Sequence, residues 1–234
     1  MLAIIGAMVK ETEQLFAEMT DGREERIGFT RLKYGTLEGV PCVLACSGVG
    51  KVHAAVCSQI VLDRYPITAL INFGIAGALD ERLSIGDCVV ASDTVQYDID
   101  TSPVGDPVGM ISGPDIVHIP ADQRLTHLLK TAAENAGCLT LSAAIATGDQ
   151  FLCGRENKLH VKNAFGAAAC DMEGGAIAQV AWESNIPYAA YRTVSDTLCG
   201  NGREYEINAR DAAEKSRQVL KGFLLAFKED EKNE

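Results

Sequence analysis

The stretch Cys170-Asp171-Met172-Glu173-Gly174-Gly175-Ala176 joins a run of small apolar residues, 167–170, to an alternating apolar segment that ends at Trp182. We expect a buried strand that ends where a helix begins. The two carboxylates would then stand at a helix N-terminus, where the helix dipole favours negative charge. The carboxyl end of a strand in an α/β sheet is also where ligands usually bind. On this stretch alone, helix capping and a ligand site are equal alternatives for Asp171 and Glu173.

Apolar runs typical of strands alternate with helical spacing on both sides of this stretch. Strands are predicted at 2–5, 29–34, 40–46, 68–73, 83–92, 139–146, 167–170 and 188–194, and helices at 11–19, 52–60, 122–136, 156–163, 176–182 and 209–227. The first run, 2–5, suits a central parallel strand. Residues 93–118 are rich in Pro and Gly and predict a long irregular excursion that completes a pocket or a subunit contact. No internal repeat or linker is visible, so we expect a single α/β domain over 1–234.

Composition narrows the class of partner. Hydrophobic residues make up 47% and charged residues 23% of the chain, which is a globular profile, and the formal net charge is −11. Because nucleic-acid binding depends on clustered Lys and Arg, we expect no nucleic-acid partner, and a small neutral or cationic ligand is easier to reconcile with this charge.

The cysteines and histidines predict no metal site. None of the eight cysteines forms a Cys-x-x-Cys pair, and the four histidines show no ligand spacing. We therefore expect buried free thiols in a reducing compartment, and no metal or other cofactor. With no signal-like segment and no apolar run of membrane-spanning length, we expect a soluble, cytoplasmic protein without a membrane partner.

Three carboxylates follow predicted strands that are far apart in the chain: Glu11, Glu173 and Asp196. If the strand ends converge, these side chains meet. Crowding of like charges raises at least one carboxyl pKa, so one group can hold a proton near neutrality while another acts as a base. Cleavage of a glycosidic bond needs this pairing, with an acid for the leaving group and a base for water.

Five motifs, in order along nearly the whole chain, resemble those of the methylthioadenosine/S-adenosylhomocysteine nucleosidases of the purine nucleoside phosphorylase-like superfamily. They are Gly6-Ala7-Met8 with Glu11, Ser47-Gly48-Val49-Gly50-Lys51, Gly74-x-Ala76-Gly77, Asp171-Met172-Glu173 and Arg192-x-x-Ser195-Asp196. The resemblance implies a three-layer α/β/α sandwich around a mixed, partly barrel-like central sheet. It also implies a homodimer in which the partner chain contributes to the pocket for the 5′-alkylthio group.

The resemblance further implies residue roles. Asp196 would protonate the purine N7, Glu11 would activate the attacking water, and Glu173 would bind the ribose hydroxyls and stabilise positive charge on the sugar. Phe151 would stack on the base, whose Watson–Crick edge the backbone at Leu152 would read. The predicted substrate-binding residues are Met8, Val49, Ala76, Gly77, Phe151, Leu152, Met172, Arg192, Ser195 and Tyr205.

Hydrolysis is favoured over phosphorolysis because a phosphorylase must hold a dianion beside the anomeric carbon, normally with arginines. Glu11 would repel that dianion, and pairing with a nearby carboxylate could explain Arg192, the one arginine within a motif. A nucleoside phosphorylase and a catalytically silent nucleoside-binding protein stay as alternatives. Departures from the family pattern at Ile75, Asp171, Gly174 and Val104 bear on the 5′-substituent.

Overall fold

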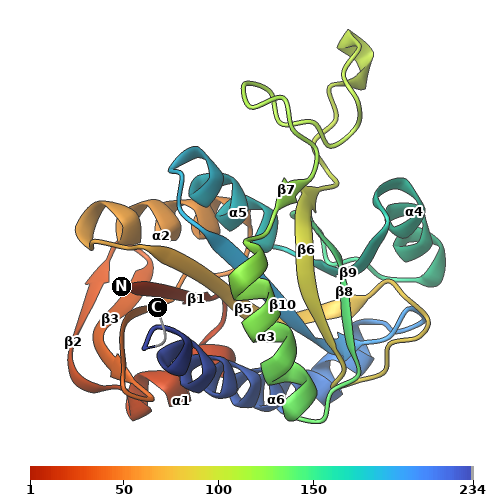
Figure 1. The fold of residues 1–234 in the computed structure, drawn as a ribbon. Coiled ribbons are helices and arrows are strands. Elements are labelled where there is room, and N and C mark those ends of the chain that lie inside the picture. The colour runs from red at the N-terminus through yellow and green to blue at the C-terminus, as the bar shows by residue number, and fades with distance from the viewer. Residues whose placement is uncertain (233–234) are drawn as a thin grey trace.

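One mixed β-sheet runs through the molecule, and helices cover both of its faces (Figure 1). The computed structural model describes residues 1–232, so the last two residues of the expected domain, 1–234, lie outside the described part. The strands are β1 (Leu2–Gly6), β2 (Thr20–Ile27), β3 (Thr30–Leu37), β4 (Val40–Cys46), β5 (Ala69–Ala78), β6 (Cys88–Gln96), β7 (Ile119–Pro120), β8 (Thr140–Thr147), β9 (Ala167–Asp171) and β10 (Tyr188–Asp196). The helices are α1 (Val9–Glu18), α2 (Lys51–Arg64), α3 (Gln123–Asn135), α4 (Arg155–Phe165), α5 (Gly174–Glu183) and α6 (Gly202–Asp230), with a 3₁₀ turn at Ser102–Val104.

The sheet is open at one end and closed on itself at the other. Its strand order is β10-β6-β8-β9-β5-β1-β4-β3-β2, and β10 also pairs with β5. The strands β5, β9, β8, β6 and β10 therefore form a closed ring, while β1 to β4 extend the sheet beyond it. Strand β1 pairs in parallel with both β4 and β5. These pairings confirm the mixed, partly barrel-like sheet and the central parallel position of β1.

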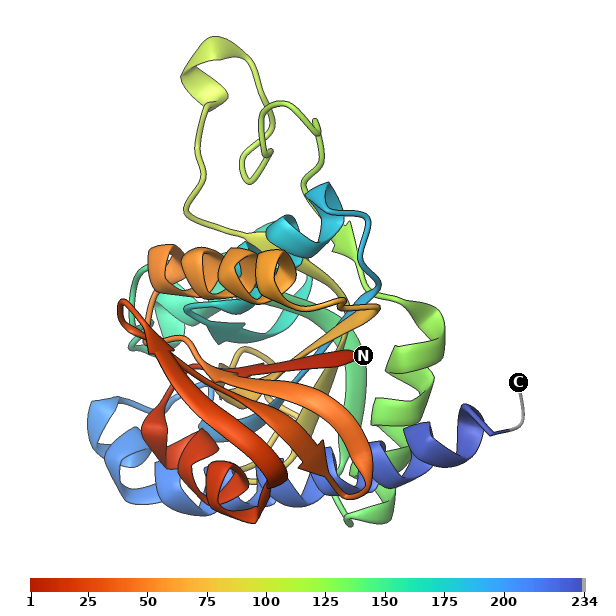
Figure 2. The same ribbon diagram turned by 90° about the vertical axis from the view of Figure 1, so that its left-hand side faces the viewer.

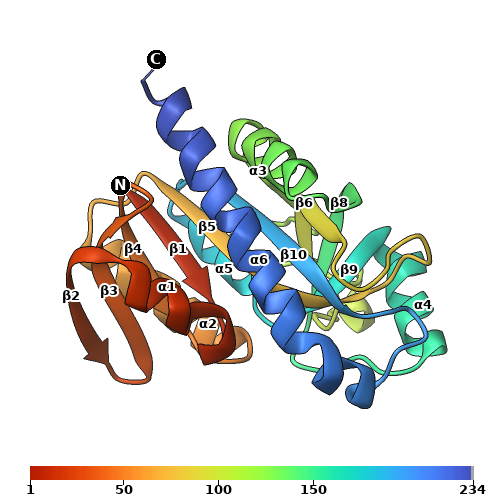
Figure 3. The ribbon, with the colours of Figure 1, turned by 90° about the horizontal axis from the view of Figure 1, so that it is seen from below.

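The helices form two outer layers, as the three-layer expectation required. Helices α2 and α5 lie on one face of the sheet, and α1, α3 and α6 lie on the other (Figures 2 and 3). On the first face, Val61 and Ile177 belong to one buried apolar cluster, and on the second, Leu15 and Phe223 belong to another. Full burial of a Val, Leu, Ile or Phe side chain stabilises the fold by roughly 1.5–3 kcal/mol, so these two clusters supply most of the driving force for layering.

Strand β5 departs from the sequence prediction in a way that shapes the site. A strand ending at Phe73 was expected, but β5 continues through Gly74 and Gly77 to Ala78. It continues because β10 pairs with it along this length and β9 pairs with it at Gly77 and Ala78. Three differences are smaller. Strand β6 begins at Cys88 and not at residue 83, and helix α6 begins at Gly202 and not at residue 209. The edge strand β2 was not predicted, because its polar, largely exposed sequence carries no strand signal.

The segment between β6 and β7 projects away from the body of the molecule (Figure 1). It is held together by backbone hydrogen bonds, including those from Gly109 N to Ile99 O (2.8 Å) and from Ile111 N to Ile116 O (2.9 Å). Val104, in the 3₁₀ turn of this segment, is 81% exposed. The long excursion expected over 93–118 is therefore present, starting after Gln96. Within residues 1–232, no helix combines the length and apolar character needed to cross a membrane.

Candidate active site

A cavity of about 190 Å³ opens where the ends of β9 and β10 meet β5 and the start of α5. Ten predicted site residues line it: Met8, Val49, Ala76, Gly77, Phe151, Leu152, Met172, Glu173, Ser195 and Tyr205. Four further residues line it that were not predicted as site residues: Ile75, Gln150, Cys170 and Asp171. The remaining predicted residues, Glu11, Arg192 and Asp196, are buried directly behind residues of this wall.

Glu11 is held by three backbone N–H groups. Its Oε2 accepts from Ala7 N (3.0 Å) and Met8 N (2.8 Å), and its Oε1 accepts from Ile75 N (3.0 Å). A Cβ on Gly74 would lie only 2.6 Å from Oε1, so glycine is required for this close approach. Burial raises the pKa of Glu11, an effect that these hydrogen bonds partly offset. Glu11 is thus a carboxylate suited to accept a proton nearer neutrality than an exposed glutamate.

Asp171 and Glu173, for which the sequence left helix capping and a ligand site as alternatives, take different positions in the structure. Asp171 Oδ2 accepts from Gly174 N (3.0 Å), so Asp171 caps α5. Glu173 makes no such cap; its Oε1 accepts from Gly50 N (2.8 Å) beyond β4, and its side chain lines the cavity. Burial, together with the negative charge of Asp171, raises the pKa of Glu173 to about 8. Asp171 therefore has a structural role, and Glu173 is left facing the ligand space.

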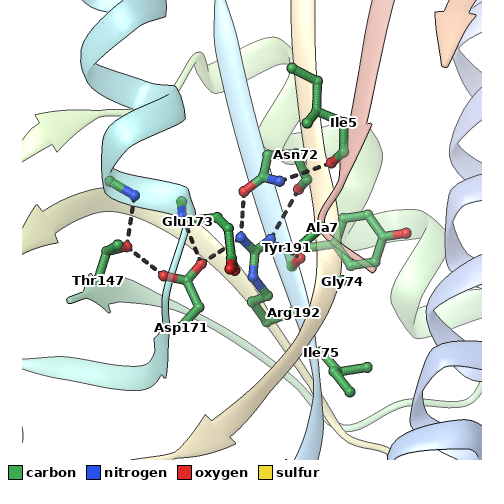
Figure 4. A network of polar contacts seen from close by, with 12 residues as sticks. Ile5, Ala7, Asn72, Gly74, Ile75, Thr147, Asp171, Glu173, Tyr191 and Arg192 are labelled. Carbon is green, nitrogen blue, oxygen red and sulfur yellow. Dashed lines mark hydrogen bonds and ion pairs between the residues drawn. The ribbon is translucent and has the colours of Figure 1, made fainter. Parts of the chain in front are cut away.

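Arg192 lies at the centre of a buried polar network behind the cavity (Figure 4). Its guanidinium forms an ion pair with Asp171 and a hydrogen bond to Asn72 Oδ1, and it donates to Tyr191 O (2.9 Å). Asn72 Nδ2 in turn donates to Ile5 O (2.9 Å). The network ties β1, β5, β9 and β10 together. Arg192 pairs with a carboxylate, and its side chain is absent from the cavity wall that the described residues form.

Asp196 is held quite differently from the two glutamates. Its Oδ1 accepts from Ser195 Oγ (2.9 Å), and its Oδ2 accepts from Lys158 Nζ (2.6 Å), which also donates to Thr197 O (2.7 Å). Lys158 is 0% and Asp196 2% exposed. A Cβ on Gly77, which lines the cavity, would lie 2.9 Å from Oδ2. Only the missing side chain of Gly77 therefore lets this carboxylate reach the wall.

Lys158 was not predicted, because it belongs to no motif in the sequence. The one available signal was its spacing: Lys158, Val161 and Phe165 are the buried residues of α4, and they share one face of a helix whose other residues are mostly polar. A lysine at an apolar position of an amphipathic helix indicates a buried partner for its charge.

Apolar and aromatic side chains form the rest of the cavity. Phe151 and Tyr205 meet edge to face, with ring centroids 5.2 Å apart. Tyr205 Oη lies 3.4 Å from Met8 Sδ. Both residues pack against the apolar cluster that Ile75 forms with alanines of α6. Among residues 1–232, no group of three or more His, Cys, Asp or Glu side chains could hold a metal ion.

The sequence and the fold both match known proteins. A family model described as "Phosphorylase superfamily" matches residues 1–225. A 5′-methylthioadenosine/S-adenosylhomocysteine nucleosidase of Shewanella loihica is 35% identical over 197 residues, which are 83% of this chain and 85% of that protein. The chain belongs to this nucleosidase family.

Solved structures agree with the family assignment. The nucleosidase of Neisseria meningitidis, in complex with methylthio-immucillin-A, superimposes with a TM-score of 0.90 at 29% identity, covering 95% of this chain and 97% of that one. A futalosine hydrolase of Helicobacter pylori superimposes with a TM-score of 0.89 at 28% identity, covering 95% and 96%. The nucleosidase fold is therefore shared with enzymes named for different nucleosides.

Proposed function

We propose that this member of the nucleosidase family hydrolyses the N-glycosidic bond of 5′-methylthioadenosine and S-adenosylhomocysteine, releasing adenine and the thioribose. The observation that carries the proposal is the placement of three carboxylates at one cavity: Glu173, from the β9–α5 junction, lines it, and Glu11 from α1 and Asp196 from β10 lie directly behind its wall residues Ile75 and Gly77. The names of the sequence relatives and the inhibitor-bound neighbour support the choice of substrate.

Each carboxylate has a separate task in this proposal. Asp196, at the end of the cavity near Gly77, delivers a proton to the purine N7 as the bond from C1′ to N9 breaks. Glu173 binds the ribose hydroxyls and stabilises the positive charge that develops on the sugar. Glu11 accepts the proton of the water that attacks C1′. Phe151 stacks on the base, and Met8, Val49 and Tyr205 contact the alkylthio group.

Water rather than phosphate is the proposed nucleophile. A phosphate dianion beside C1′ would face Glu11, and the negative charge of that carboxylate would repel it. No arginine or lysine is among the described residues that line the cavity, and the guanidinium of Arg192 is already paired with Asp171. A phosphorylase would need a cation at this position.

One assay tests the proposal. The protein is incubated with methylthioadenosine with and without phosphate, and the sugar product is identified. Free methylthioribose in the absence of phosphate is expected. A sugar phosphate formed only with phosphate would show a phosphorylase, and nucleoside binding without turnover would show a silent binding protein. Faster turnover of futalosine than of methylthioadenosine would contradict the proposed substrate while leaving the reaction type intact.

We further propose a homodimer whose partner chain closes the 5′ end of the cavity. Exposed apolar side chains support it: Val52, 74% exposed, and Val56 lie on one face of α2, and Phe29 lies in a groove that shares Met8 and Val49 with the cavity. Light scattering of wild type and Val52→Asp tests it, with a dimer expected for the wild type and a larger monomer fraction for the variant. A cytoplasmic location is also proposed, supported by eight free cysteines.

A further inference from the structure

The ion pair between Lys158 and Asp196 is unusual because both charges are removed from water. Burying an unpaired ammonium costs several kcal/mol, and a pair offsets that cost only with close contacts. Lys158 Nζ has two such contacts, 2.6 Å to Asp196 Oδ2 and 2.7 Å to Thr197 O. The pair lies behind Gly77, at the end of the cavity where the purine N7 is proposed to lie.

The hydrogen bonds of Asp196 do not show the proton that it is proposed to donate to N7. Both of its oxygens accept hydrogen bonds, one from a hydroxyl and one from an ammonium. Each oxygen already accepts a hydrogen from a neighbouring donor, so neither contact shows a hydrogen that Asp196 itself points toward N7. Of the two donors, only the ammonium of Lys158 carries a positive charge and three hydrogens, and it touches Asp196 Oδ2 directly.

We propose that Lys158 is the proton source for the leaving purine and that Asp196 conveys its proton to N7. The inference rests on the hydrolysis proposed above. Lys158 Nζ–H gives its proton to Asp196 Oδ2, and Asp196 gives a proton to N7 while the electron pair of the C1′–N9 bond moves into the purine. Glu11 takes a proton from the attacking water. Loss of that proton to solvent and uptake of one by the Lys158 amine restore the free enzyme.

The groups around Lys158 and Asp196 are either neutral or engaged in contacts of their own, so none competes for the proton of Lys158. Cys170 on β9 is near the pair, and burial raises its pKa to about 12, so it is a neutral thiol. On α4, Lys162 is paired with Asp80 (3.0 Å). From α6, Glu204 contacts Thr197, accepting from its backbone N–H at 2.6 Å. Asp171 and Arg192 form a second buried ion pair, which joins β9 to β10.

Lys158 acts through Asp196, so the test needs a readout that a packing role would not change. We would measure kcat and KM for methylthioadenosine from pH 5 to 9 with wild type, Lys158→Met and Lys162→Met. Lys162 is the matched control, since it is an ion-paired lysine one turn along the same helix, outside the cavity wall.

In Lys158→Met, Asp196 must take its proton from solvent, which buried carboxyls do at low pH. The ratio of variant to wild-type kcat should be within about threefold of unity at pH 5 and fall by roughly 10²-fold by pH 9, with KM changed less than kcat. Lys162→Met should keep a flat ratio. A flat ratio for Lys158→Met, whether near unity or uniformly low, would overturn the proposal. Loss of wild-type hydrolysis itself would instead refute the proposed function.

A second variant covers the case in which Lys158→Met does not fold. Lys158→Arg keeps a cation beside Asp196, but a guanidinium does not release its proton at these pH values. In the same pH series, the ratio of its kcat to the wild-type kcat should also fall as pH rises. A Lys158→Arg variant with the wild-type pH dependence would overturn the proposal.

Discussion

The two ends of the cavity hold their carboxylates by different means. At the sugar end, Glu11 and Glu173 accept hydrogen bonds from backbone N–H groups, and within residues 1–232 neither forms an ion pair. At the base end, Asp196 is fixed by the ammonium of Lys158 and the hydroxyl of Ser195. Burial raises the pKa of both glutamates. The comparison shows that similarly buried carboxylates can be held by different donors, which are backbone N–H groups at the sugar end and a buried ammonium with a hydroxyl at the base end.

The largest expected effect is on activity and concerns Glu11, the proposed proton acceptor at the sugar end. Glu11→Gln removes the group that accepts the proton of water, and kcat should fall by about 10²–10⁴-fold. Glu13→Gln, on an exposed position of the same helix, serves as the control and should keep the wild-type rate. Steady-state assays at pH 7 measure both. A Glu11→Gln variant with full activity would remove the assignment of the base.

At the base end, removing the carboxylate of the buried ion pair should lower the free energy of unfolding. Asp196→Asn leaves the Lys158 ammonium buried without its carboxylate, so the free energy of unfolding should fall by about 3–5 kcal/mol. Glu24→Gln breaks the exposed pair with Arg31 and should cost less than about 1 kcal/mol. Urea unfolding at pH 7 compares the two. Equal small losses would mean that the buried pair is not charged.

Glu173→Gln should change stability in the opposite direction. The pKa of Glu173 is 4.5 before burial and about 8 in the folded protein, so the folded state binds the extra proton between these values. Its contribution to stability is thus present at low pH and is lost as pH rises through 8. The variant should equal wild type near pH 4.5 and exceed it by a few kcal/mol, on the order of 1.4 per pH unit, near pH 8.

Urea unfolding at pH 4.5, 6.5 and 8.5 measures this difference, with Glu206→Gln on an exposed position of α6 as the control. A difference between Glu173→Gln and wild type that does not grow with pH would contradict the account of the sugar end.

The smallest effect concerns the aromatic wall between the two ends. Phe151→Ala removes the ring proposed to stack on the base, which is worth about 1–3 kcal/mol per base in other proteins. KM for methylthioadenosine should rise about tenfold, with kcat less affected. Phe151→Tyr keeps the ring and should keep KM. If both variants raise KM equally, the ring does not contact the base.

The sequence predicted the alternation of elements and ten of the residues that line the cavity, because apolar periodicity and glycine-rich strand ends are local signals. It did not predict the continuation of β5 through Gly74 and Gly77, since that depends on pairing with β9 and β10. It missed Lys158 for a related reason. The partner of a buried lysine lies 38 residues away in the chain, and only packing brings the two together.

The placement of Asp171 and Glu173 likewise could not be decided locally. Both stand at the start of α5, and either could have capped it. The ion pair with Arg192 and the approach of Gly50 from beyond β4 separate their roles, and both contacts join distant parts of the chain.

The central claim is that Glu11, Glu173 and Asp196 surround one purine riboside, and a crystal structure with methylthio-immucillin-A tests it most directly. The account predicts the base nitrogen at position 7 within about 3 Å of Asp196, the sugar hydroxyls on Glu173, and Glu11 facing the anomeric position. A ligand bound outside this cavity, or with its base at the Glu11 end, would contradict it.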